Sequence, residues 1–130
     1  MTEIQLKSIL KEFDTIQKKV KIQENCLNIY KNAKTMSDYK KNKLIVKIIS
    51  NVIDILNPSE AFVINTHLIT HYTWTETTEL YSRKFGKNQE KSERTLKRVQ
   101  NKGISKMLEI INTLEVNDIF HLSFLWYKNP

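Results

Sequence analysis

Apolar side chains recur every three or four positions through the first thirty residues, and this spacing predicts one long amphipathic helix. Thr2 with Glu3 provides its start. The apolar positions are Leu6, Ile9, Phe13, Ile16, Val20, Leu27 and Tyr30, with Gln23 as a polar interruption. Residues 32–37 break the pattern, and a broader stripe then predicts a second helix over about 37–56. The two helices pair as an antiparallel hairpin, or the first forms a coiled coil with a second copy through residues 6–30.

A strong helix start follows at Asn57, where a capping residue precedes a proline at the first helical position and Glu60 faces the positive end of the helix dipole. This helix is expected to reach about His71. Thr73 or Thr75 caps the next helix, over about 76–85. Its inward side chains are predicted to be Leu80, Tyr81 and Phe85, and Gly86 follows as its C-terminal residue.

Ser92 is expected to cap a final helix with an apolar seam on one face and a basic surface on the other. The seam comprises Leu96, Val99, Gly103, Met107, Ile110 and Leu114. Gly103 should weaken the middle of this helix by about 1 kcal/mol relative to alanine. With the seam buried, a period of 3.6 residues turns Glu93, Arg94, Lys97, Arg98 and Asn101 outward.

Composition supports a globular all-α protein, because 40% of residues are apolar, 27% are charged, and there are only two Gly and two Pro. We expect a hairpin or dimerisation segment at 1–56, a helix-turn-helix domain at 57–115, and an apolar tail at 116–130 that packs on the body or on a partner. No apolar run approaches the roughly 18 residues of a membrane span, and Cys26 has no disulfide partner within the chain. These features favour a cytoplasmic protein without a membrane partner, in which Cys26 is a partly buried apolar residue.

The positive charge is concentrated in residues 83–106, where nine Lys and Arg side chains face only Glu90 and Glu93, a net charge of +7. Residues 1–56 form a second basic lobe of +5, and residues 57–82, at −3, separate the two. A solvated charged helix is the plain alternative. However, a short helix, a loop and a capped basic helix are together typical of a helix-turn-helix, whose last helix enters the major groove by its start.

The residue types on this surface suit double-stranded DNA. Arg can read guanine, Asn can read adenine and Glu can accept from cytosine. Lysines and the cap at the start of the helix suit phosphates, which position a protein without reading sequence. The predicted DNA-binding residues are Lys91, Ser92, Glu93, Arg94, Lys97, Arg98, Asn101 and Lys102, with Lys87 and Lys106 as further phosphate contacts.

The stretch from NPSEAFVINTHLITHYTW through SERTLKRVQNKGISKMLEII, residues 57 to about 112, resembles region 4 of bacterial sigma factors. It is more similar to the small phage and prophage late-gene regulators of the ArpU type. Ser92, the pairs at 93–94 and 97–98, and Gly103 occupy the family's cap, basic and small-residue positions. The loop at 86–91 is longer than the family's tight turn. The resemblance implies a sigma-like factor or late-gene transcription activator that acts on phage promoters, and we expect such a regulator to act with RNA polymerase.

Enzyme chemistry finds little support, and we expect no catalytic residue, cofactor or metal. His67 and His71 stand four apart, a spacing that can suit zinc, but Leu68 replaces the glutamate of a metalloprotease motif. We expect His71 beside Trp74, which closes the corner between two helices, and His67 on the solvent side. Glu76 and Glu79 are explained by the helix dipole.

A second class of function stays open. The heptads and the aromatic tail, with His121, Phe124, Trp126 and Tyr127, also suit a protein-interaction module such as an anti-repressor or a polymerase-binding protein.

Overall fold

The structure is a computed structural model that describes residues 1–115, so the predicted tail at 116–130 lies outside the described residues. Throughout the described part, all regular structure is helical, which confirms the all-α prediction. The elements are α1 (Glu3–Lys11), α2 (Phe13–Ile29), α3 (Ala33–Ile55), α4 (Pro58–Val63), the π-helix η1 (Ile64–Ile69), α5 (Trp74–Phe85), the 3-10 turn η2 (Lys87–Gln89) and α6 (Glu93–Thr113). None of these helices has the length and apolar content needed to cross a membrane.

The first predicted helix is two helices, because the chain bends at Glu12, where φ is −97° and ψ is 1°. Beyond the bend, α2 packs along α3, whereas α1 packs against α6 and η1. The apolar spacing continues through the bend, but its first part, with Leu6 and Leu10 fully buried, contacts different partners from its second part. The prediction of one long helix was therefore wrong, although its buried face was identified correctly.

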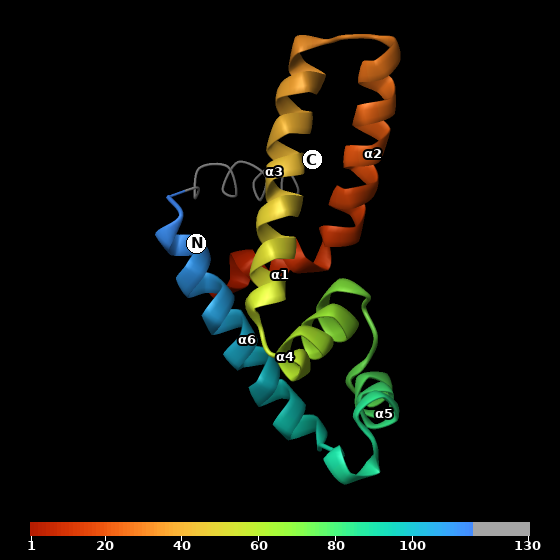
Figure 1. Ribbon diagram of the computed structural model, residues 1–130, viewed down its shortest axis with the longest axis vertical. Helices are drawn as coiled ribbons and strands as arrows, with labels where there is room; N and C mark the ends of the chain where they lie inside the picture. The colour runs from red at the N-terminus through yellow and green to blue at the C-terminus, as the bar shows by residue number, and fades with distance from the viewer. Residues whose placement is uncertain (116–130) are drawn as a thin grey trace.

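The helical hairpin forms within one chain, and Figure 1 shows α2 and α3 projecting together away from the other helices. Asn32 caps α3 by accepting the Thr35 N–H at 3.1 Å, so α3 starts four residues before the predicted position. Gln23 is buried in the hairpin, where the Asn42 Nδ2 donates to its Oε1 at 3.2 Å. Cys26 is exposed, contrary to the prediction of partial burial.

One continuous apolar cluster joins the hairpin base to the second half of the chain. Its members come from α1, α2, α3, η1 and α6 and include Leu6, Ile45, Ile49, Ile64, Ile104 and Ile111. Residues on both sides of the predicted boundary at 56 thus share a core. A smaller cluster of Val63, Tyr81 and Leu96 fixes α5 against α4 and α6.

Gly103 lies where α6 crosses the segment formed by α4 and η1. A Cβ atom there would stand 2.6 Å from the Ile64 Cδ1 and 3.4 Å from the Glu60 Cβ. The glycine is therefore explained by this close crossing, which sets the direction of α6. Beside it, the almost fully buried Glu60 accepts from the Lys106 Nζ at 2.9 Å and also caps the Asn57 N–H.

Candidate functional site

The start of α6 is fixed by a side-chain cap, as the sequence predicts. The Ser92 Oγ accepts the Thr95 N–H at 3.2 Å and also lies 2.9 Å from the Thr95 Oγ1. The preceding α5 is capped by Thr73 and ends at Gly86, whose φ of +89° is a conformation that glycine adopts without strain. Figure 1 shows the start of α6 at the end of the molecule opposite the hairpin tip.

The predicted outward face of α6 is confirmed. Glu93, Arg94, Lys97, Arg98, Asn101 and Lys102 are all exposed, Ser92 is exposed, and Lys91 is half-buried. The opposite face buries Leu96, Gln100, Gly103, Ile104, Met107 and Ile111. The seam is thus shifted slightly from the predicted one, because Leu114 is exposed while Ile104 and Ile111 are buried.

The exposed side chains of α6 divide into two groups. Arg94, Arg98 and Lys102 follow one another at intervals of four residues, and within residues 1–115 none of them has an ion-pair partner. We call these three residues the basic ridge. Lys97 is constrained instead, since its Nζ lies 3.2 Å from a Glu93 carboxylate oxygen and 5.8 Å from the centre of the Trp74 ring.

Lys106 was predicted as a phosphate contact, and the structure gives it a different role. Its ammonium forms the ion pair with the buried Glu60 described above, so its charge is already balanced. Removing that ammonium would leave a buried carboxylate without its cation, and such pairs are costly to break.

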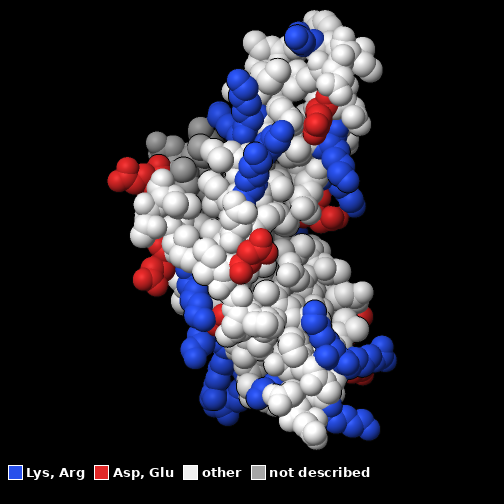
Figure 2. Space-filling model, in the orientation of Figure 1, with Lys and Arg blue, Asp and Glu red and all other residues white. Residues whose placement is uncertain are grey.

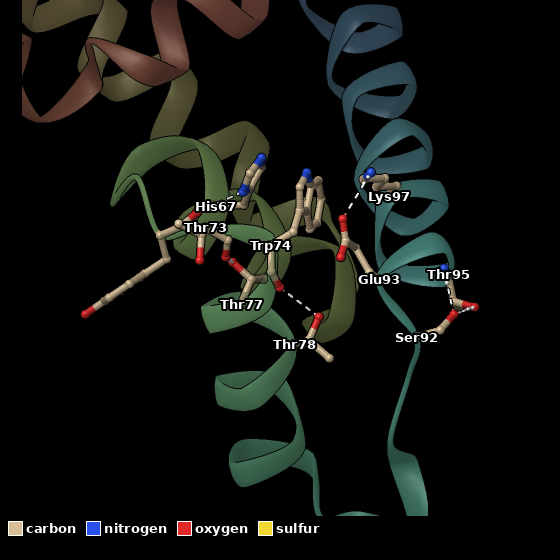
Figure 3. A network of polar contacts seen from close by, with 10 residues as sticks. His67, Thr73, Trp74, Thr77, Thr78, Ser92, Glu93, Thr95 and Lys97 are labelled. Atoms are coloured by element: carbon tan, nitrogen blue, oxygen red, sulfur yellow. Dashed lines mark hydrogen bonds and ion pairs between the residues drawn. The ribbon is translucent and has the colours of Figure 1, made fainter.

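The two histidines are placed the other way round from the prediction, because His67 and not His71 lies beside Trp74. His67 stacks on Trp74, with the ring centres 3.7 Å apart and the planes at 23° (Figure 3). His71 is exposed, adopts a positive φ of 68°, and donates from its Nε2 to the Lys11 carbonyl at 2.7 Å. That hydrogen bond ties the corner after η1 to the end of α1. Among the described residues, no group of side chains is arranged to hold a metal ion.

The environment of His67 favours its neutral form. Its Nδ1 donates to the Tyr72 carbonyl at 2.9 Å, so the neutral ring carries its acceptor lone pair on Nε2. Burial lowers the pKa of His67 below its ordinary value of 6.5, and the nearby charges of Lys11 and Lys97 lower this pKa further, against the opposing effects of the Tyr72 bond and Glu93.

A cavity of about 300 Å³ opens beside the stacked rings, between α1, η1, the start of α5 and α6. We call it the corner cavity. The residues that matter for its chemistry are Lys7, Lys11, His67, Trp74, Lys97 and Gln100. Sequence reasoning missed it, since Lys7 and Lys11 come from a helix that is distant in sequence and meets α6 only through folding. The one available signal was their spacing of four residues, which places both on one face of α1.

Basic side chains gather at the end of the molecule that carries this site. Figure 2 shows Lys and Arg side chains over α5 and α6 at the lower end, and a second group along the hairpin. This distribution agrees with the two basic lobes in the sequence. Comparisons with protein-family models, curated proteins and solved structures give no match to this chain.

Proposed function

We propose that this protein is a sequence-specific DNA-binding transcription regulator in which the start of α6 enters the major groove. The observation that carries the proposal is the basic ridge, three exposed cations at successive turns of one capped helix without acidic partners among residues 1–115. A solvated helix usually mixes both signs of charge, as α1 and α2 do through their Glu3–Lys7 and Asp14–Lys18 pairs. The helix α6 has one such pair, Glu93–Lys97, but the basic ridge lies outside it.

Within this proposal, the residues of the α6 surface have different roles. Arg94 and Arg98 read base edges, because a guanidinium can bond guanine through both O6 and N7, and Asn101 can read adenine. Lys102 and Lys91 contact phosphates. Ser92 acts through the backbone N–H groups at the helix start, since its hydroxyl already caps the helix.

The hairpin leaves room for a protein partner. Its tip lies at the opposite end from the start of α6 (Figure 1), and the second half of α2 with the tip exposes Ile22, Ile29 and Tyr30 by 68%, 91% and 66%. In the regulator that we propose, RNA polymerase or a second copy of the chain binds there, although the resemblance to sigma region 4 covers only the second half of the chain and does not itself account for the hairpin. The same exposed side chains favour the second candidate, a protein-interaction module that acts without DNA.

The test is a selection of bound duplexes from a randomised DNA library at about 150 mM salt, where weak long-range charge effects are screened. We expect the wild-type protein to enrich one sequence motif, and the Arg94→Ala/Arg98→Ala variant to lose it. Both substitutions are at exposed positions, so the helical circular dichroism should not change. The charge-matched control is Lys40→Ala/Lys47→Ala on the exposed side of α3.

No enrichment by the wild-type protein would remove the DNA-binding proposal, and the same motif with the ridge variant would remove the assignment of the basic ridge as the surface that reads DNA. Binding that depends on phosphates should also weaken with salt. The logarithm of the association constant should fall against the logarithm of the salt concentration with a slope of about −0.9 per phosphate contact. An Ile22→Ser/Ile29→Ser variant tests whether the hairpin takes part in binding, because it should keep the selected motif if α6 alone reads DNA.

A further inference from the structure

The corner cavity is lined by cations and by no acidic side chain. Its three lysines come from two helices, Lys7 and Lys11 from α1 and Lys97 from α6. Lys7 and Lys97 have carboxylate partners within their own helices, at 2.9 Å and 3.2 Å, whereas Lys11 makes no ion pair within residues 1–115. The cavity is therefore lined by one ammonium group without a carboxylate partner and by two that are paired with exposed carboxylates, a charge distribution that favours an anion.

The residues that line the cavity also include two polar side chains with hydrogen-bonding capacity, Gln100 and His67. Gln100 is only 6% exposed, and its Oε1 is buried without a hydrogen-bond partner in the described part of the chain. A buried amide oxygen without a donor costs free energy, so such an atom calls for an explanation such as a ligand. The Nε2 of neutral His67, which also lines the cavity, is a second acceptor.

The two kinds of group together restrict the chemistry of the occupant. The lysines require negative charge, and the acceptors of Gln100 and His67 require a donor on the same ligand. A phosphate ester satisfies both, because its charged oxygens accept from ammonium groups while a hydroxyl or amino group of the ester donates. A cavity of about 300 Å³ is at the small end of ligand sites, which suits one nucleotide unit and not a larger molecule.

We propose that the corner cavity binds the phosphate group of a nucleotide unit, held by Lys7, Lys11 and Lys97 beside the stacked rings of His67 and Trp74. Figure 3 shows that stack standing next to Lys97 and Glu93 of α6. Binding draws the Lys97 ammonium from Glu93 toward the ligand. The nucleotide is either part of a DNA backbone or a free mononucleotide, and only the first source rests on the proposed DNA-binding function.

The experiment uses the full chain labelled with ¹⁵N and follows the indole N–H signal of Trp74, which the spectrum of a Trp74→Phe variant assigns. The probes are inorganic phosphate, adenosine 5′-monophosphate and a mixed-sequence DNA duplex. The test variant is Lys7→Gln/Lys11→Gln. The control, Lys18→Gln/Lys40→Gln, removes the same charge and likewise includes one lysine paired four residues from its acid, since Lys18 bonds Asp14.

If the ligand is free, the monophosphate shifts the Trp74 signal to saturation, and the test variant weakens binding about tenfold while the control stays within about twofold. If the phosphate belongs to DNA, only the duplex distinguishes the two variants, and the salt slope becomes shallower by about 0.9 for each lysine–phosphate interaction that the substitutions remove. Binding of the monophosphate without any binding of DNA would keep the cavity proposal and remove the regulator.

The proposal is overturned if the test and control variants bind all three probes equally. It is also overturned if the probes bind while the Trp74 signal stays unchanged. A dispersed Trp74 signal in the test variant, before any probe is added, shows that the corner is still folded, so weaker binding cannot be assigned to unfolding.

Discussion

The buried amide pair in the hairpin gives a prediction about stability: replacing one amide should destabilise the protein, and replacing both should not. Asn42 and Gln23 are 7% and 8% exposed and bond each other across α2 and α3. Replacing Asn42 by leucine removes the donor and leaves the Gln23 amide in a dry site, at a cost of about 1–3 kcal/mol. The added apolar surface offsets only part of this cost, so we expect Asn42→Leu to be less stable than wild type.

Replacing both residues should reverse the destabilisation. In Gln23→Leu/Asn42→Leu the unsatisfied amides are gone, and a leucine at position 23 completes the apolar spacing of α2. We expect the double variant to be at least as stable as wild type, with a coupling free energy of about 1–2 kcal/mol between the two sites. Urea unfolding followed by circular dichroism measures all four members of the cycle.

A coupling near zero would refute this reasoning, because it would mean that both amides reach water in the folded protein. A second readout is association. A polar pair inside a helical seam specifies one alignment of the helices, and a fully apolar seam accepts several. Light scattering should therefore find more dimer for the double variant than for wild type.

Three further predictions concern the corner and the α6 crossing. Gly103→Ala should lower the free energy of unfolding by about 1 kcal/mol, because overpacking at the close crossing outweighs the better helix propensity of alanine; a higher melting temperature would contradict this. Lys106→Met should cost about 1–2 kcal/mol in a urea titration, a figure reduced because the lysine is half exposed, and an unchanged midpoint would show that Glu60 needs no cation. Because the pKa of His67 is lowered, the unfolded chain binds a proton that the folded chain does not, and stability should fall as the pH drops below about 6.5. Between about pH 8 and about pH 5.5, the melting temperature should therefore fall less for His67→Gln than for wild type. An equal fall in both proteins would argue against a neutral His67.

The caps at Asn57, Thr73 and Ser92 were predictable because each rests on a contact only three residues long, whereas the same kind of cap at Asn32 was missed and α3 was placed four residues late. Asn57, Thr73 and Ser92 all accept a backbone N–H from the third residue that follows. The outward face of α6 was predictable for a related reason, since a long regular helix keeps its period of 3.6 residues from Ser92 onward. Sequence reasoning therefore gave the correct exposure for the residues of the basic ridge.

Features that depend on distant contacts could not be predicted. The bend at Glu12 arises because α1 and α2 pack on different elements, and the apolar spacing passes through it without a signal. The π-helix η1 holds more residues per turn than an α-helix, so positions after Ile64 rotate away from their expected faces. This rotation accounts for the position of His67, whereas His71 lies beyond η1 at a turn residue with a positive φ. The corner cavity forms only because α1 packs beside α6, and no local sequence pattern predicts that contact.

The projecting hairpin has a consequence for how the length of this protein can vary among related chains. Beyond the bend, the outer turns of α2 and α3 pack mainly on each other, and Figure 1 shows no other described helix beside them. Inserting or deleting seven residues in both helices would change the length of the hairpin by about 10 Å and restore the same apolar seam between α2 and α3. The hairpin can thus change in length, which changes the distance between its tip and α6, while the shared core stays unaltered.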